Sequence, residues 1–163
     1  MWHREMTSGS PAPAPSVREH PHYAMAEDLW SAVSSGDASR LRRILSPNIR
    51  WHSYGAGDLS GTFVGADAVL DLLASTGEMV DQLASTLIDI SVSDRGAVLR
   101  YEVEAQRGSK KLHVEHLAIL EIRADRIVET ITVPVDQDEN DRFWDTSKDR
   151  AAARTLRGNG EHR

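Results

Sequence analysis

The chain has 163 residues, of which 40% are hydrophobic and 27% are charged. These proportions are ordinary for a globular protein, and the length suits one domain with a substantial core. The formal net charge of −6 excludes a general attraction to nucleic acid or anionic membranes, and the lack of cysteine excludes disulfides and thiolate metal sites. No stretch approaches the roughly 20 apolar residues that span a bilayer, and the N-terminus lacks the apolar core of a signal peptide, so we expect a cytoplasmic protein.

Composition divides the chain into three parts. Residues 1–21 are rich in Pro, Ser and Ala, which is typical of a disordered tail. Residues 22–145 carry the periodic apolar patterns of a folded domain, and residues 146–163 read as a polar C-terminal tail.

The domain begins with two expected helices. Apolar residues recur at helical spacing after Tyr23, and Gly36 stands where a helix ends. Asp37 is placed to cap the second helix, which Pro47 terminates. The elements expected next are a strand over 49–54, an extended piece at 62–63, a helix over 66–74 and a strand over 85–92.

The run from Ala97 to Val133 alternates apolar and polar residues in three long segments. This period of two is typical of strands that bury one face of a sheet. Gly108-Ser109 and Ala124-Asp125 suit two-residue hairpin loops, and Asp136 is placed to cap a final helix that ends near Trp144. Helices followed by an antiparallel meander predict an α+β fold, with the helices packed on one face of the sheet.

Three ionisable residues interrupt the apolar rows of these strands: Tyr101, His116 and Glu129. A polar group in such a row needs a partner, a cavity or water, so the pattern predicts a pocket. The Gly108-Ser109 turn places Tyr101 opposite His116, about 5 Å away. The next turn places Leu120 opposite Glu129, which puts the carboxylate roughly 13 Å from the imidazole along the strands, where the two groups could act on opposite ends of a substrate. The structural alternatives are a buried histidine bonded to Tyr101 and a carboxylate paired with an arginine.

Weaker candidates are His52 and Asp136. The apolar row of Ile49 and Trp51 favours a His52 that points away from the core, and Asp136 has a simple role as a helix cap. A metal site is not expected, since the strand spacing puts His113 and His116 on opposite faces. Nothing in the sequence implies a nucleotide cofactor, because it has no Gly-rich phosphate loop after a buried parallel strand.

The order and spacing of four segments resemble the SnoaL-like group of the NTF2-like superfamily, which includes polyketide cyclases and relatives of ketosteroid isomerase. These segments are LWSAVSSGD (29–37), LSPNIRWHSYG (45–55), GTFVGADAV (61–69) and RADRIVETITVPVDQ (123–137). The resemblance implies a curved sheet wrapped around helices into a cone with a pocket inside. It also implies a homodimer, and Leu117 and Ile119 on the polar face are candidates for the dimer contact.

The resemblance also indicates which residues carry the chemistry. The ketosteroid isomerase positions fall on Leu29, Ala118 and either His52 or Ser53, so that enzyme's own chemistry is not expected. In SnoaL-like cyclases a carboxylate and a histidine do acid–base work, and the matching candidates are Asp136 or Glu129 with His116 or His52. The residues expected to line the substrate pocket are Trp30, Trp51, Tyr54, Phe63, Leu99, Ala118, Ile131 and Val133.

We therefore expect a cofactor-independent enzyme of secondary metabolism that binds a small apolar molecule and shifts a proton next to a carbonyl, giving isomerisation or cyclisation. In this interpretation His116 is the general acid or base and Tyr101 orients it or stabilises an oxyanion. The alternative is a non-catalytic module for ligand binding or dimerisation. Epoxide hydrolysis ranks lower, because no inward Asp–Arg–Asp set is apparent.

Overall fold

The computed structural model describes residues 16–147 and 149–150. Most of residues 1–21 and 146–163, the two expected tails, lies outside this part. The helical elements are the 3-10 turn η1 (Val17–Glu19) and the α-helices α1 (Pro21–Ser35), α2 (Ala38–Ile44), α3 (Ala66–Glu78) and α4 (Gln137–Trp144). The strands are β1 (Leu45–Ser53), β2 (Gly61–Val64), β3 (Gln82–Ser93), β4 (Gly96–Arg107), β5 (Lys110–Arg123) and β6 (Arg126–Pro134). Within this part of the chain, no helix has the length and apolar character that crossing a membrane requires.

The end of α1 and the start of α2 lie at the capping residues that the sequence predicts. Pro21 occupies the first turn of α1, and Gly36 ends that helix with a φ of 67°. The side chain of Asp37 accepts a hydrogen bond of 2.9 Å from the backbone N–H of Arg40 and so caps α2. α3 continues past the expected end at Ala74 to Glu78.

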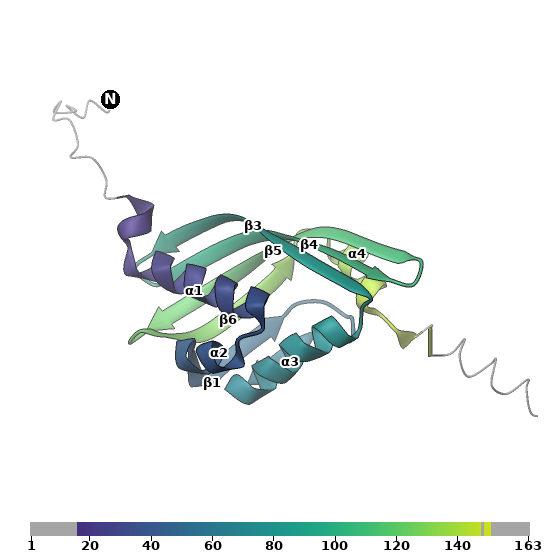
Figure 1. Cartoon of the computed structure of the whole chain (residues 1–163), viewed down its shortest axis with the longest axis horizontal. Coiled ribbons are helices and arrows are strands. Elements are labelled where there is room, and N and C mark those ends of the chain that lie inside the picture. The colour runs from purple at the N-terminus through teal and green to yellow at the C-terminus, as the bar shows by residue number, and fades with distance from the viewer. Residues whose placement is uncertain (1–15, 148, 151–163) are drawn as a thin grey trace, which may run out of the picture.

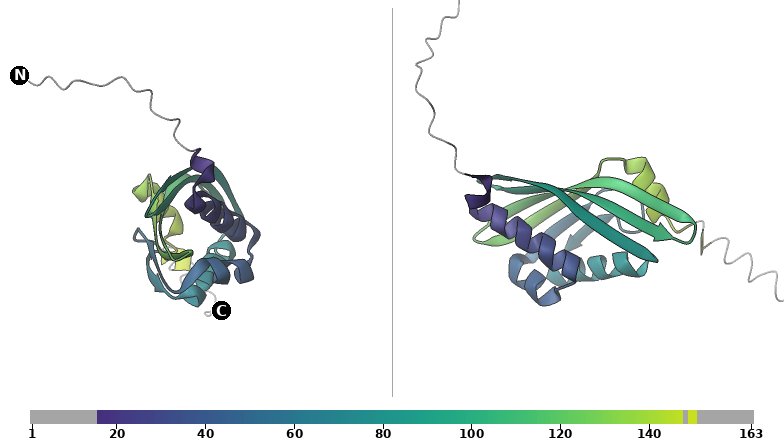
Figure 2. Two further views of the ribbon diagram at one scale, coloured as in Figure 1. Left: turned by 90° about the vertical axis from the view of Figure 1, so that its left-hand side faces the viewer. Right: turned by 45° about the horizontal axis from the view of Figure 1, so that its top comes forward.

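The six strands form one mixed sheet in the order β2-β1-β6-β5-β4-β3. β1 runs parallel to β6, and every other neighbouring pair is antiparallel. Figure 1 shows α1, α2 and α3 on one face of this sheet, and the end-on view of Figure 2 shows the strands curving around them. This is the α+β cone that the resemblance implies. We call the face that meets the helices the inner face and the opposite one the outer face.

Both predicted hairpin turns are confirmed. Arg107 pairs with Lys110 across Gly108-Ser109, and Arg123 pairs with Arg126 across Ala124-Asp125. Ala124 and Asp125 take positive φ angles of 46° and 58°, as a tight two-residue hairpin loop of this kind requires.

The core fills the space between α1 and the inner face. Ala26, Leu29 and Ala32 of α1 are buried against strand residues that include Leu99 and Leu120. A second cluster joins Phe143 and Trp144 of α4 to Val103, Ala105, Leu112 and Val114 of β4 and β5. α4 therefore covers the end of the sheet near the β4–β5 hairpin (Figure 1).

The predicted register of β6 is wrong beyond its first residues. Ile122 pairs with Ile127 as expected, but Glu121 then pairs with Glu129, so Val128 is an extra residue in β6. One extra residue turns every following side chain to the other face. The expected inward positions of Glu129, Ile131 and Val133 are corrected accordingly. These three side chains share the outer face with Glu121, Ile119 and Leu117, respectively.

Candidate functional site

Two adjoining cavities lie between the helices and the inner face of the sheet. Their volumes are about 240 Å³ and about 290 Å³, and both are lined by Val33 of α1, Trp51 of β1, Leu73 of α3, Leu83 and Ser85 of β3, and Tyr101 of β4. Because they share these residues, we treat them as one chamber with two arms and call it the inner chamber.

The two arms differ in polarity. One arm ends on Leu29, Trp30, Leu99 and Ala118 and is lined mainly by apolar side chains, although Ser34 and Ser85 also line it. The other extends toward α4 and carries the polar side chains of Ser53, Ser60, Thr76, His116, Thr132 and Asn140. Among the described residues, no Asp, Glu, Lys or Arg lines either arm. The chamber therefore suits an uncharged molecule with one apolar end and one end that forms hydrogen bonds.

Three aromatic rings are in contact along the wall of the chamber, and the middle one, Tyr101, lines both arms. Tyr101 pairs with His116 across β4 and β5, as the turn geometry predicts, and their rings are stacked at 5.5 Å with 16° between the planes. The Trp30 ring of α1 lies 5.3 Å from the Tyr101 ring and is tilted by 56° to it. A hydroxyphenyl group and an imidazole thus line the wall of one cavity side by side.

Burial controls the protonation of both groups. Removal from water raises the pKa of the Tyr101 hydroxyl, so this side chain stays a neutral hydrogen-bond donor. The same effect lowers the pKa of His116, although the Val114 carbonyl and the Asn140 side chain oppose it in part. His116 is therefore a neutral imidazole near pH 7, and its Nδ1 is buried without a hydrogen-bond partner among the described residues.

Asn140 is a lining residue that the sequence reasoning missed. It is 7% exposed, and its Oδ1 is also buried without a partner in the described part of the chain. The sequence carried a signal for its burial, because the spacing puts Asn140 on one helix face with Phe143 and Trp144. In the structure all three side chains are buried. An amide on an otherwise apolar helix face needs a hydrogen-bond partner or a cavity, as a histidine in an apolar strand row does.

The structure places the expected pocket residues in three groups. Trp30, Trp51, Tyr54, Leu99 and Ala118 line the inner chamber. Phe63 packs against the core but does not line either arm. Ile131 and Val133 lie on the outer face, for the reason of register given above.

His52 and Glu129 meet on the outer face of the sheet. His52 Nε2 lies 2.7 Å from Glu129 Oε1, and His52 Nδ1 lies 2.9 Å from Thr62 Oγ1. The prediction that His52 points away from the core is confirmed. These contacts connect side chains of the neighbouring strands β2, β1 and β6. The carboxylate of Glu129, which the sequence analysis places inside the pocket, is therefore paired with His52 on the outer face.

Asp136 caps α4, as the structural interpretation predicts. Its Oδ1 accepts a hydrogen bond of 2.9 Å from the backbone N–H of Glu139, and Asp136 does not line the chamber. His113 is paired with Glu104 on β4, so it faces away from His116, which lies three positions on in the same strand.

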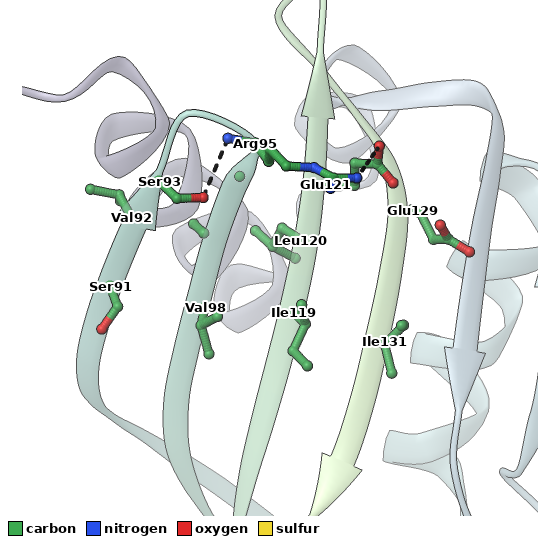
Figure 3. A pocket seen from close by; sticks show the side chains of 12 residues that line it. Ser91, Val92, Ser93, Arg95, Val98, Ile119, Leu120, Glu121, Glu129 and Ile131 are labelled. Carbon is green, nitrogen blue, oxygen red and sulfur yellow. Dashed lines mark hydrogen bonds and ion pairs between the residues drawn. The ribbon is translucent and has the colours of Figure 1, made fainter.

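A second hollow lies on the outer face and is shown in Figure 3. Its volume is about 440 Å³, and Val98, Ile119 and Ile131 form its apolar floor. Arg95 and Glu121 form an ion pair of 3.9 Å at one rim, and Glu129 stands at another edge (Figure 3). We call this hollow the outer groove.

The inner chamber is the stronger candidate for a small-molecule site, although the outer groove is larger than either arm of the chamber. The carboxylates at the groove are already paired, Glu121 with Arg95 and Arg123, and Glu129 with His52. The chamber instead holds two polar atoms that are buried and unpaired within the described residues. Buried polar groups are nearly always satisfied in folded proteins, so these two atoms need a water molecule or a ligand group as a partner.

Comparison with known proteins agrees with this architecture. The sequence model of the SnoaL-like domain matches residues 26–130. No curated protein matches the chain. Among solved structures, Bal32a from a soil-derived mobile gene cassette is 24% identical, with a TM-score of 0.70 over 76% of this chain and 98% of that one.

Two further structures illustrate the range of similar proteins. A Xanthomonas campestris protein of unknown function with a cystatin-like fold is 28% identical, with a TM-score of 0.69 over 75% of this chain and 96% of that one. A putative SnoaL-like polyketide cyclase from Jannaschia sp. CCS1 is 11% identical, with a TM-score of 0.59 over 71% of this chain and 89% of that one. At this level of identity the cyclase shows a shared fold and nothing more.

Proposed function

We propose a catalytic role for this chain, which belongs to the SnoaL-like domain family. Its inner chamber binds a small uncharged carbonyl compound, and a side chain in the chamber moves a proton on the carbon next to the carbonyl. The observation that carries the proposal is the neutral His116 imidazole, which is stacked on Tyr101 in a chamber lined by no charged side chain of the described residues. The outcome for the substrate is isomerisation or ring closure.

The groups in the chamber suffice for a proton transfer with one base. The neutral imidazole of His116 takes a proton from the carbon beside the carbonyl, which leaves an enolate and an imidazolium. The Tyr101 hydroxyl donates a hydrogen bond to the enolate oxygen, where the negative charge develops. The imidazolium then returns its proton to a second carbon. Alternatively, the enolate carbon attacks a second carbonyl carbon of the same molecule and closes a ring, and the oxygen of that carbonyl takes the imidazolium proton. A low pKa for the imidazole favours the return of the proton.

A second acid–base residue is not part of this proposal. Glu129 is paired with His52 on the outer face, and Asp136 caps α4. The same His116 therefore removes and returns the proton.

Exchange of hydrogen for deuterium on 1-tetralone tests the proposal without knowledge of the natural substrate. This uncharged bicyclic ketone has acidic C–H bonds beside its carbonyl, and exchange in D₂O is followed by NMR. We expect exchange above the buffer rate with the wild-type chain, and a loss of about 100-fold or more in His116→Phe. His113→Phe makes the same replacement on the outer face and should leave exchange unchanged. An equal rate in His116→Phe and the wild type would contradict the proposed role.

A non-catalytic ligand carrier is the second candidate. The absence of a carboxylate from the described lining of the chamber favours it, because acid–base enzymes often use a second titratable group. Binding of 1-tetralone without any exchange above background would support the carrier.

For the outer face we propose a second copy of this chain as the partner. Ile119 is 40% exposed on the floor of the outer groove, which it forms with Val98 and Ile131. Arg95 and Glu121 lie together at the groove rim, so a two-fold arrangement can exchange ion pairs between copies. Light scattering coupled to gel filtration should give a dimer for the wild type and a monomer for Ile119→Lys. A monomeric wild type, or a dimer unaffected by this charge, would contradict this interface.

A further inference from the structure

The polar arm of the inner chamber ends on two neighbouring side chains from different elements. His116 comes from β5 and Asn140 from α4, and both line the same cavity. The buried atoms without a partner among the described residues include His116 Nδ1 and Asn140 Oδ1. A carbonyl oxygen only accepts hydrogen bonds, whereas an imidazole nitrogen donates or accepts according to its tautomer. The Asn140 side chain lies near enough to His116 to raise its pKa, but neither atom has a partner at hydrogen-bond geometry among the described residues. A ligand group that both donates and accepts would give both atoms a well-formed hydrogen bond.

The helix that carries Asn140 is held firmly in place. Arg107 Nη2 donates a hydrogen bond of 2.6 Å to the Phe143 carbonyl, and the Arg107 guanidinium lies over the Phe143 ring. On the opposite side, Asp141 Oδ1 accepts a hydrogen bond of 2.9 Å from the backbone N–H of Ala56. With its helix fixed at both places, the Asn140 amide is presented to the chamber in a defined position.

We propose that Asn140 is a specificity-determining residue, which with His116 binds a hydroxyl group of the ligand at the polar end of the chamber. A hydroxyl satisfies both groups at once, since it donates to one of them and accepts from the Asn140 amide or the imidazole N–H. A carboxylate in the same place finds no positive side chain among the described lining residues and leaves Asn140 Oδ1 facing a second acceptor. The ligand class is then an uncharged molecule with an apolar ring system at one end and an alcohol, phenol or enol at the other.

This inference rests on the proposed binding role of the chamber, but it is independent of catalysis. It explains why an amide occupies an otherwise apolar helix face, where an aliphatic side chain of similar size would avoid the cost of a buried polar group.

A pair of matched probes tests the inference. 1-Naphthol and 1-methylnaphthalene have nearly the same shape and differ by a hydroxyl in place of a methyl group, and 1-naphthoate supplies the anion. We expect the wild type to bind 1-naphthol about tenfold more tightly than 1-methylnaphthalene, the effect of one good hydrogen bond, and not to bind 1-naphthoate measurably. Dissociation constants are measured by quenching of protein or naphthalene fluorescence.

Substitutions on α4 then locate the hydroxyl. Asn140→Leu should reduce the preference for 1-naphthol to less than about twofold and leave the affinity for 1-methylnaphthalene unchanged. The retained affinity for 1-methylnaphthalene also shows that the variant is folded. Gln137→Leu replaces another amide side chain on the same helix, outside the chamber, and should keep the preference. Should Asn140→Leu fail to fold, Asn140→Ala serves in its place with the same expectation.

The outcomes separate the two proposals. A hydroxyl preference that survives in Asn140→Leu would overturn the role of Asn140, as would equal binding of both probes by the wild type, and in either case the chamber would still be a ligand site. Failure of the wild type to bind either naphthalene would overturn the inference and the proposed function together.

Discussion

Replacement of His116 by Phe should stabilise the fold, and more so at acidic pH. The new ring keeps the stacking on Tyr101 and removes the buried Nδ1, which lacks a partner among the described residues and whose burial costs about 1–3 kcal/mol. We therefore expect a gain of about 1 kcal/mol in the free energy of unfolding at pH 7.5, after allowance for imperfect packing of the larger ring.

The pH dependence follows from the lowered pKa of His116. The ordinary value for histidine is 6.5, and the folded protein takes up this proton only at a lower pH. Between these two values the unfolded chain binds more protons, so the wild type loses stability as the pH falls below about 6.5. Each unit by which folding lowers the pKa is worth about 1.4 kcal/mol at low pH. His116→Phe lacks this loss, and its advantage over the wild type should grow from pH 7.5 to pH 5.

Urea denaturation at pH 5.0, 6.0 and 7.5 measures the difference, and the other histidines cancel because both proteins contain them. His113→Phe, in which an exposed histidine is replaced, controls for the general loss of an imidazole. If the difference in free energy between His116→Phe and the wild type is the same at all three pH values, the reasoning about the burial of His116 is refuted.

Three further predictions concern the surroundings of the site. Gly96→Ala places a Cβ atom 1.8 Å from the Leu120 carbonyl oxygen, so it should cost about 3 kcal/mol or more in thermal unfolding; a melting temperature like that of the wild type would refute this packing. Asp136→Ala removes the cap of α4 and should cost about 1 kcal/mol, whereas Asp136→Asn should restore most of it. Glu129→Gln on the outer face should leave binding of 1-naphthol within about twofold of the wild type, and a larger loss would connect the outer pair to the chamber.

Local signals were sufficient for the strand pair that carries the central residues. The Gly108-Ser109 turn has a two-residue loop, and this alone fixes Tyr101 opposite His116. Helix capping was equally readable, because an Asp immediately before an apolar helix face has one dominant structural use, as Asp37 and Asp136 show.

The position of Glu129 could not be predicted in the same way. The Ala124-Asp125 turn was identified correctly, but the bulge at Val128 has no Gly or Pro to mark it and turns the rest of β6 over. The alternation of Ile127, Glu129, Ile131 and Val133 is therefore split between the two faces of the sheet. The chamber on the inner face and the groove on the outer face are both lined by apolar residues. Ile131 and Val133 would therefore suit either face, and the composition of β6 does not reveal the error in its register.

Asn140 was missed in the sequence analysis because its position in the chamber depends on contacts between distant segments. Asn140 enters the chamber only because α4 packs across β4 and β5 through Phe143 and Trp144. The sequence predicts this helix and its apolar stripe, but not the wall against which the stripe lies.

NMR of the histidine side chains during titration with 1-naphthol tests the central claim most directly, since it distinguishes the inner chamber from the outer face in one spectrum. We predict that the His116 resonances shift on binding, that His116 titrates below pH 6.5 in the free protein, and that the resonances of His52 and His113 stay in place. Shifts at His52 with an unchanged His116 would place the ligand on the outer face and contradict the account.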